Sequence, residues 1–502
     1  MKNIVEYLER STKKNPDKIA VIDEFGKCTY QKLEELSKKS GSFLIKEGAV
    51  RVPVIVFMDK SIDALSTFLG IAYADSTYTL INPELPISRI EKIDETLNTK
   101  YVVTDKEHFD AAKEIFKNKN IYLVDELKKG RINEKDLDRV RENFIDIDPL
   151  YTNFTSGSTG TPKGVSVCHR SVIEFIDIFT EEFNITKKDV IGNQAPFDFD
   201  VSVKDIYSSL CVGATLVIIP RRLFSSPAEL LDFICDHEVT TMVWAVSALC
   251  LISTFHGLDY RVPSKVNKIL FSGEVMPIKH LNKWMEALPK ATFVNLYGPT
   301  EITCNCTYHI IDRKREYEKY IPIGKSFANE RVFLLDENDK LITEPETKGE
   351  ICVSGTCLAL GYYSNKEETD KHFTQNPLNK NYIELIYRTG DLGMYNKEQE
   401  LVFQGRKDFQ IKYNGHRIEL EEIEKSMMKV EGIERACCLF NEEKQRLYGF
   451  YVGNMDKAEL HTALKETLPV YMIPGILKQV DSMPLTKNGK IDRKELMSLV
   501  VK

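Results

Sequence analysis

Short apolar runs alternate with amphipathic helical stretches along most of this chain. Strand-like runs occupy residues 18–22, 54–58, 101–104, 121–124, 268–272 and 291–295, and helical patterns cover residues 2–14, 33–48 and 62–75. Ser226, followed by Pro227 and Glu229, predicts a further helix start with a capping serine. Alternation of this kind is typical of βαβ units. We therefore predict an α/β fold whose sheets are largely parallel.

The pattern changes after Lys340. Shorter alternating runs at residues 351–354, 387–391 and 401–404 predict an antiparallel, β-rich layer. The last hundred or so residues predict a small α+β module with helices near 420–430 and 457–467. Because 502 residues exceed what one core usually supports, we predict two domains, residues 1–405 and a mobile C-terminal domain of residues 406–502.

A glycine-rich loop follows one of the predicted strands. Residues 151–164 hold three glycines, six serine or threonine hydroxyls and Lys163. Glycine backbone approaches a polyanion closely, and hydroxyls and a lysine add donors and charge. The loop is not the P-loop of ATPases, because Pro162 precedes the lysine and Gly164 follows it. It is either a phosphate-binding loop or a flexible surface loop.

Composition limits the classes of partner. A net charge of −7 argues against nucleic acid as the main partner. The N-terminus has no apolar signal core, and the run at residues 211–220 is too short to cross a bilayer, so we expect no membrane insertion. The 11 cysteines are scattered without a metal-binding spacing, which predicts reduced thiols in a cytoplasmic protein.

Three polar, glycine-containing turns follow predicted strands, near residues 154, 272 and 295. In open α/β sheets, ligands bind where loops leave the carboxyl ends of strands. We therefore expect these three loops to converge on one site.

Seven motifs in order carry a resemblance over nearly the whole chain. They lie at residues 155–164, 199–202, 295–301, 349–361, 387–391, 405–424 and 488–493. With them the chain resembles the adenylate-forming superfamily of acyl- and aryl-CoA synthetases, luciferases and peptide-synthetase adenylation domains. Within it, the chain is most similar to the free-standing amino-acid-activating enzymes, among them the D-alanine–D-alanyl carrier protein ligase family. The segment at residues 271–277 supports this similarity.

The resemblance implies a two-step reaction. The carboxylate of a small amino acid, with D-alanine the first candidate, attacks the α-phosphorus of ATP and releases pyrophosphate. A phosphopantetheine thiol on a carrier protein then takes the acyl group as a thioester. Since no carrier domain follows Arg493, we expect a separate carrier protein.

The resemblance also assigns the nucleotide site. Lys490, after the Asn488-Gly489 turn, would bridge the substrate carboxylate and the α-phosphate. Glu301 would hold Mg²⁺, a cation that prefers oxygen ligands. The ATP-binding residues implied are Thr155, Ser156, Gly157, Ser158, Thr159, Gly160, Lys163, Asn295, Leu296, Tyr297, Gly298, Pro299, Thr300, Asp391, Phe403, Gln404, Gly405, Arg406 and Lys490. Of these, Asn295 and Tyr297 would face adenine, Thr300 the α-phosphate, and Asp391 and Arg406 the ribose. An ordinary turn is the alternative reading for Asp391 and for Lys490.

Asp408 matches the hinge of the family. There the C-terminal domain swings between an adenylating and a thiolating pose, and Gly415 would lie on the second face. A plain interdomain linker is the alternative.

The amino-acid pocket implied by the resemblance comprises Asp200, Val201, Lys204, Ser272, Cys304 and Lys490, and its remaining positions are Val243, Leu270, Leu296 and Asn305. Asp200 would pair with the substrate ammonium, or else cap a helix. The D-alanine-activating family has a cysteine where this chain has Ser272 and an apolar residue where it has Lys204. Lys204 lies one helical turn after Asp200, so the two side chains either pair, as we favour, or Lys204 meets an acidic or polar substrate side chain.

Three rival functions stay open at this point. An acyl-CoA synthetase would use free coenzyme A in place of the carrier, but Asp200 argues against it. An adenylating enzyme for an acidic or polar amino acid in peptide synthesis would use Lys204. A relative without catalytic activity would show no pyrophosphate exchange, and the intact Lys490, Asp391, Arg406 and Glu301 argue against it.

Overall fold

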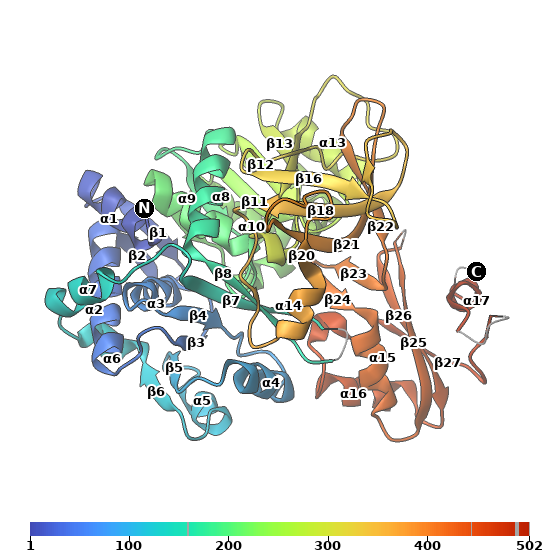
Figure 1. Ribbon diagram of the computed structural model, residues 1–502, viewed down its shortest axis with the longest axis horizontal. Helices are drawn as coiled ribbons and strands as arrows, with labels where there is room; N and C mark the ends of the chain where they lie inside the picture. The colour runs from blue at the N-terminus through green and yellow to red at the C-terminus, as the bar shows by residue number, and fades with distance from the viewer. Residues whose placement is uncertain (158–159, 443, 487–490, 501–502) are drawn as a thin grey trace. The chain divides into compact units, whose positions relative to one another are not determined.

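The computed structural model describes residues 1–157, 160–442, 444–486 and 491–500 (Figure 1). The chain divides into two compact units. The first comprises Met1–Pro83, Leu97–Asn153 and Val165–Lys407, and the second comprises Glu84–Thr96, Phe154–Gly164 and Asp408–Lys502. The second unit thus takes in two segments that precede residue 406. As a statement about domains that move, the division into residues 1–405 and 406–502 stays a prediction.

The first sheet contains nine strands within the described residues, in the order β15-β14-β13-β12-β11-β9-β10-β1-β2. The strands from β13 to β1 in this order pair in parallel, and the outer pairs are antiparallel. Their bounds are β1 Ile19–Asp23, β2 Gly26–Thr29, β9 Val190–Asn193, β10 Thr215–Ile218, β11 Thr241–Ala245, β12 Lys268–Ser272, β13 Thr292–Tyr297, β14 Thr307–Ile310 and β15 Lys325–Ser326.

A second sheet of seven described strands has the order β19-β8-β7-β4-β3-β5-β6. The pairs among β3 to β7 are parallel. Its strands are β3 Pro53–Phe57, β4 Thr77–Leu80, β5 Tyr101–Thr104, β6 Asn120–Leu123, β7 Pro149–Thr155, β8 Lys163–Cys168 and β19 Gly361–Tyr362. The predicted α/β class with largely parallel sheets is confirmed.

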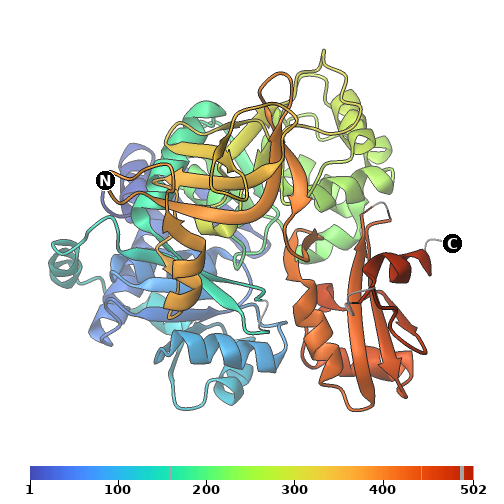
Figure 2. The ribbon, with the colours of Figure 1, turned by 45° about the vertical axis from the view of Figure 1, so that its right-hand side comes forward.

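The third sheet is the antiparallel layer, drawn in yellow and orange in Figure 2. It begins at Glu330, earlier than the change after Lys340 that we predicted. Its strands are β16 Glu330–Leu335, β17 Leu341–Ile342, β18 Gly349–Gly355, β20 Phe373–Gln375, β21 Leu385–Tyr395 and β22 Leu401–Arg406.

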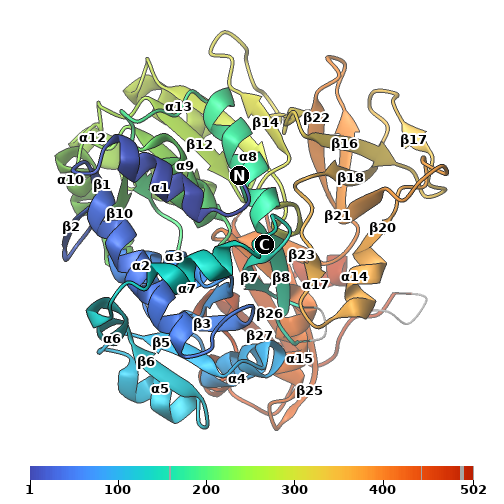
Figure 3. The ribbon, with the colours of Figure 1, turned by 60° about the vertical axis from the view of Figure 1, so that its left-hand side comes forward.

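The N-terminal part of the chain also contains helices before and between its strands. Helices α2, α3 and α7 lie side by side (Figure 3). Thr29 and Ser61 cap α2 and α3 through their side chains. The helices are α1 Val5–Lys14, α2 Tyr30–Lys46, α3 Ile62–Tyr73, α4 Ile87–Leu97, α5 Phe109–Ile115, α6 Val124–Lys129, α7 Glu134–Arg141, α8 His169–Glu182, α9 Val201–Val212, α10 Pro227–Asp236, α11 Val246–Thr254, α12 Gly257–Tyr260, α13 Ile278–Ala287 and α14 Lys366–His372, with short 3₁₀ turns at Arg221–Ser225 and Thr300–Ile302.

One predicted cap is wrong. Helix α10 starts at Pro227 as expected, but Ser226 makes no side-chain capping bond. Its ψ of 92° differs from the 163° and 172° of Thr29 and Ser61, whose hydroxyls do accept from the helix backbone. The backbone of Ser226 therefore does not present its hydroxyl to the helix, and Pro227 is the signal that located this helix start.

The second unit contains the sheet β25-β26-β27 and the hairpin β23-β24. Asn414 and Gly415 join the hairpin with φ values of 52° and 78°, as an Asn-Gly turn of the primed type requires. Arg89 of α4 pairs with Glu422 of α15 at 2.7 Å, and both side chains are buried. The elements are β23 Gln410–Tyr413, β24 His416–Glu419, α15 Leu420–Met428, β25 Ile433–Asn441, β26 Arg446–Gly453, α16 Lys457–Lys465, a 3₁₀ turn Val470–Met472, β27 Ile476–Gln479 and α17 Arg493–Ser498.

Glu330 in β16 is a buried acid that makes stability depend on pH. Burial raises the pKa of Glu330 from 4.5 to about 8, although a hydrogen bond with Cys357 acts to lower it. Between these two values the unfolded chain ionises while the folded chain keeps the proton, so folding loses stability as pH rises. We expect Glu330→Gln to stabilise the protein at pH 8 by more than about 1 kcal/mol and to change little at pH 4.5. Urea unfolding at both pH values measures this, and equal effects at the two would contradict it.

Candidate active site

Neighbouring parallel strands of the first sheet bring three polar loops to one edge. Strand β9 pairs with β11, β11 with β12, and β12 with β13. The loop after β9 leads to Asp200, the loop after β12 follows Ser272, and the loop after β13 contains Gly298. The predicted convergence holds for the loops after β12 and β13. The third predicted loop follows β7, which belongs to the second sheet, so a shared sheet edge cannot explain its place.

Tyr297, Asp391 and Arg406 form a buried polar group. The Tyr297 hydroxyl donates to Oδ2 of Asp391 at 2.5 Å, and Arg406 donates to Oδ1 of the same carboxylate. Strand register places Asp391 opposite Arg406, and Asp391 is 2% exposed. The Phe403 ring lies 6.3 Å from the Tyr297 ring. These four residues were all predicted from sequence, and the structure brings them together.

Asn295 and Glu301 lie on the same stretch of chain. Asn295 donates from Nδ2 to the Pro322 carbonyl at 2.9 Å. Glu301 is 1% exposed and accepts from the Tyr362 hydroxyl at 2.7 Å. Among the described residues, no group of three or more His, Cys, Asp or Glu side chains suits a metal ion. A single carboxylate still fits Mg²⁺, which takes few ligands from protein and the rest from phosphate and water.

The glycine-rich loop folds tightly at Gly157. A Cβ there would lie 2.2 Å from the Thr161 carbonyl oxygen, and the Gly160 N–H donates to the Gly157 carbonyl at 2.8 Å. Lys163 opens β8, and Thr155 ends β7. Ser158, Thr159 and Lys490, like the Asn488-Gly489 turn, lie outside the described residues. Asp408 is the first residue of the last segment of the second unit, and its Oδ1 accepts from the Gln410 N–H at 3.1 Å.

Asp200 stands at the N-cap position of α9, but its side chain makes no capping bond. The thiol of Cys304 donates to the Asp200 carbonyl at 3.1 Å. The loop that carries Cys304 is constrained, because Thr303 and Cys304 have φ values of 54° and 76°. Helix capping by its side chain therefore does not account for Asp200, and its place in the amino-acid pocket stays a prediction.

Lys204 contradicts the pairing that we favoured. Its side chain is 0% exposed, so the ammonium does not reach solvent. Across the described part of the chain, Nζ makes one hydrogen bond, to Oδ1 of Asn305 at 2.6 Å, and no ion pair. Asp200 lies near enough that its charge opposes the lowering of the Lys204 pKa, for which burial is the main cause. The i, i+4 rule failed because Asn305, distant in sequence, supplies the acceptor.

Sequence reasoning missed a second lysine near this site, the half-buried Lys60. Lys60, just after β3, donates to the Gln194 carbonyl at 2.9 Å and to Oδ1 of Asn193 at 3.0 Å. Asn193 in turn donates from Nδ2 to Oδ2 of Asp205 at 2.8 Å. This network fixes the segment that leads from β9 into α9, and so positions Asp200. Lys60 lies in a polar turn directly after the predicted strand at residues 54–58, and this position was the signal that could have identified it.

Gly298 allows the pocket loops to pack closely. A Cβ on Gly298 would lie 2.4 Å from Cα of Asn305 and 2.8 Å from the Cys304 carbonyl oxygen. Both atoms are backbone and cannot move aside cheaply. We expect Gly298→Ala to lower the free energy of unfolding by about 1–3 kcal/mol, measured by urea denaturation. The control is Gly26→Ala, where a Cβ meets nothing within 4 Å. Equal effects of the two variants would refute the steric argument.

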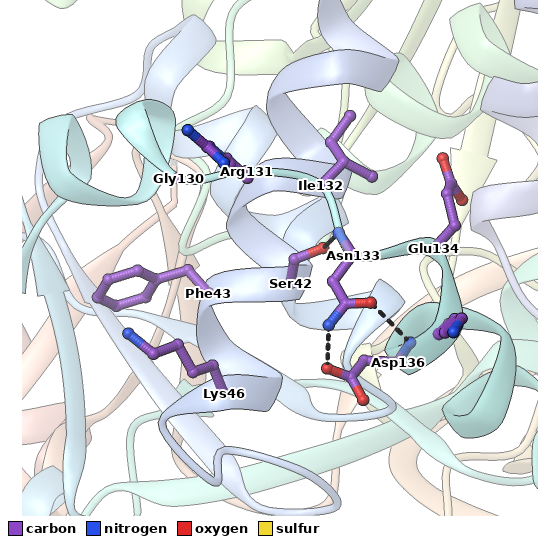
Figure 4. A pocket seen from close by; sticks show the side chains of 10 residues that line it. Ser42, Phe43, Lys46, Gly130, Arg131, Ile132, Asn133, Glu134 and Asp136 are labelled. Carbon is purple, nitrogen blue, oxygen red and sulfur yellow. Dashed lines mark hydrogen bonds between the residues drawn. The ribbon is translucent and has the colours of Figure 1, made fainter.

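A separate cavity of about 630 Å³ lies between α2 and α7 (Figure 4). Asn133 bridges its wall, donating from its backbone N–H to Ser42 Oγ at 3.0 Å and from Nδ2 to Asp136 at 2.5 Å. Its described lining contains none of the site residues predicted from sequence.

Comparison with known proteins identifies the family to which this chain belongs. Residues 8–363 match the family model described as AMP-binding enzyme, and residues 422–490 match the AMP-binding enzyme C-terminal domain. The chain belongs to the AMP-binding enzyme family. Adenylate-forming enzymes use ATP. The structure also agrees with this class in having a large mixed α/β part and a smaller C-terminal part.

Individual relatives narrow the comparison. The chain is 32% identical to D-alanine--D-alanyl carrier protein ligase of Bacillus cereus (strain Q1), over 99% of each chain. It is 34% identical to Bacitracin synthase 1 of Bacillus licheniformis over 99% of this chain, but it spans only 9% of that protein. The Vibrio cholerae adenylation domain AlmE, solved in complex with glycyl-adenosine-5'-phosphate, shares the fold with a TM-score of 0.87 and 22% identity, covering 100% of this chain and 98% of that one.

Two further observations concern thiols and membranes. All 11 cysteines are free thiols. Among the described residues, no helix combines the length and the apolar character needed to cross a bilayer.

Proposed function

We propose that this protein is an AMP-forming amino acid:carrier protein ligase. A carboxylate oxygen of the amino acid attacks the α-phosphorus of ATP, the bond to the bridging oxygen breaks, and pyrophosphate leaves. The sulfur of a carrier-bound phosphopantetheine then attacks the acyl carbon, the thiol proton is lost, and AMP leaves. The 32% identity with D-alanine--D-alanyl carrier protein ligase, which spans 99% of both chains, carries this proposal and makes D-alanine the first amino acid to test.

The residues divide the task between charge and position. Asp391, held by Tyr297 and Arg406, offers a carboxylate of fixed orientation to the ribose hydroxyls. Tyr297 and Phe403 supply aromatic surface for adenine. Thr300 and the glycine-rich loop supply donors for the phosphates, and Lys490 supplies a positive charge at the α-phosphate. Mg²⁺ on Glu301 would neutralise phosphate charge when bound.

The amino acid would enter beside α9. Asp200 is the acid that we assign to its ammonium, since a half-buried carboxylate gains from a cation that offsets its partial loss of hydration. Val201, Ser272 and Cys304 would line the remaining space. Such a carboxylate has no use in an acyl-CoA synthetase for simple acids, which is why we place that function second.

Two assays test the proposal. ATP–pyrophosphate exchange across D- and L-amino acids, including D-alanine, glutamate and aspartate, should reveal one preferred substrate. With that substrate, radiolabel should move to a carrier protein bearing phosphopantetheine and not to free coenzyme A. Exchange with no amino acid would refute the proposal, and transfer to coenzyme A alone would favour the acyl-CoA synthetase.

A further inference from the structure

Lys204, one helical turn after Asp200, is a fully buried lysine that makes no ion pair in the described structure. Of the three N–H groups of the Lys204 ammonium, one donates to Asn305 at 2.6 Å, and the described residues form no ion pair with it. Both Lys204 and Asn305 are almost fully buried. A buried charge without a counterion is costly, so a protein retains such a group where a bound ligand supplies the opposite charge.

Asp205 is the second carboxylate, after Asp200, whose charge acts on Lys204, and its contacts argue against a role as its counterion. Its Oδ2 accepts from Asn193, and its Oδ1 has no hydrogen-bond partner within the described structure. Burial raises the pKa of Asp205 to about 7, and the charges of Lys204 and Lys60 only partly offset this. Asp205 is therefore not bonded to Lys204, and the lysine retains two N–H groups for a ligand.

A second donor in the same region also lacks a partner. Tyr151 is fully buried, and its hydroxyl has no hydrogen-bond partner among the described residues. Its ring lies 5.8 Å from the ring of Tyr78. Burial raises the pKa of Tyr151, and Cys304 and Asp200 raise it further. The neighbouring Tyr78 and Tyr207 hydroxyls, in contrast, bond to each other at 2.9 Å. Tyr207 and Lys204 both belong to α9, so the Tyr151 ring lies close to a neighbour of the helix that carries Lys204. This geometry points to one ligand for both groups.

We propose that the amino acid activated by this protein carries a carboxylate in its side chain, bound by the ammonium of Lys204 and the hydroxyl of Tyr151. This inference rests on the proposed function, in which Asp200 takes the substrate ammonium. Residues four apart on a helix lie on one face, about 5–6 Å between Cβ atoms. Asp200 and Lys204 therefore present opposite charges side by side, to match the ammonium and the side-chain carboxylate of an acidic amino acid.

The wild-type protein gives the first test. ATP–pyrophosphate exchange is measured with glutamate and aspartate in both configurations, with glutamine and asparagine, with methionine and with D-alanine. We expect one acidic amino acid to exceed its carboxamide and the apolar analogues by at least about 100-fold in kcat/KM, because a site built for a charged acceptor rejects analogues that leave its donors unpaired.

Three outcomes would overturn the inference. A preference for D-alanine or methionine keeps the proposed function and refutes the carboxylate. A carboxamide substrate refutes it as well. Exchange with no amino acid refutes both the inference and the proposed function.

Variants give a second, independent test. Lys204→Met should lower exchange with the acidic substrate by at least about 100-fold and leave the apolar analogue unchanged or improved. Tyr151→Phe removes only a hydroxyl, and should raise KM for the acid about tenfold with kcat preserved. The matched control is Lys268→Met, which removes a partly buried lysine paired with Asp189 outside the pocket. Equal loss for acidic and apolar substrates in Lys204→Met would contradict the assigned contact.

Discussion

Replacing Lys490 with alanine is expected to lower ATP–pyrophosphate exchange by at least about 100-fold, the cost of removing one preorganised charge from a developing transition state. The first half-reaction brings an anionic carboxylate to a polyanionic phosphate, and a lysine is the group that offsets this repulsion. Lys490 follows Asn488-Gly489, a pair that favours a tight turn. It lies outside the described residues, so the prediction rests on the sequence motif and on the family.

The informative control compares the two half-reactions. Transfer of a preformed aminoacyl adenylate to the carrier should survive in Lys490→Ala, because that step no longer involves the attack on phosphorus. Lys478→Ala removes another lysine of the second unit, whose ammonium bonds only to the Leu499 carbonyl in the described structure, and should retain full exchange. Near-normal exchange by Lys490→Ala would refute the catalytic role, and equal loss of both half-reactions would point to general damage.

The fold followed closely from periodicity. Strand β12 occupies Lys268–Ser272, the residues predicted for it, because strands buried on both faces form continuous apolar runs. Tyr297, Asp391 and Arg406 were also found from sequence, since their motifs occupy strand ends and strand registers that local pattern defines. The local sequence pattern thus predicts each helix or strand and the residues at its ends.

Contacts between distant segments were beyond sequence reasoning. The partner of Lys204 is Asn305, and Lys60 holds the loop at Gln194, across spans that no periodicity links. The lysine in α9 was expected to pair with Asp200 because a local rule was available. The loop that supplies Asn305 also bonds to the start of α9 through Cys304, and Gly298 permits the close approach of its backbone.

Asp391→Ala is the second change with a large expected effect. Asp391 accepts from Tyr297 and Arg406 at once, so its removal takes one acceptor from a buried hydroxyl and the ion-pair partner from a largely buried guanidinium. Breaking one side of a buried ion pair costs about 3–5 kcal/mol. We expect the free energy of unfolding to fall by this amount and KM for ATP to rise at least about tenfold, because a bond to a charged group contributes about 1.5–3 kcal/mol.

Two comparisons separate stability from nucleotide binding. Asp370→Ala removes an exposed carboxylate paired with Lys366 in α14, and should change stability by less than about 0.5 kcal/mol. Asp391→Asn keeps an oxygen acceptor for one neighbour, so it should recover part of the stability. If the carboxylate itself binds the ribose, Asp391→Asn should still show a raised KM for ATP at a temperature where it is fully folded. A normal KM in that variant would make Asp391 a structural partner of Arg406 and move ribose recognition to another group.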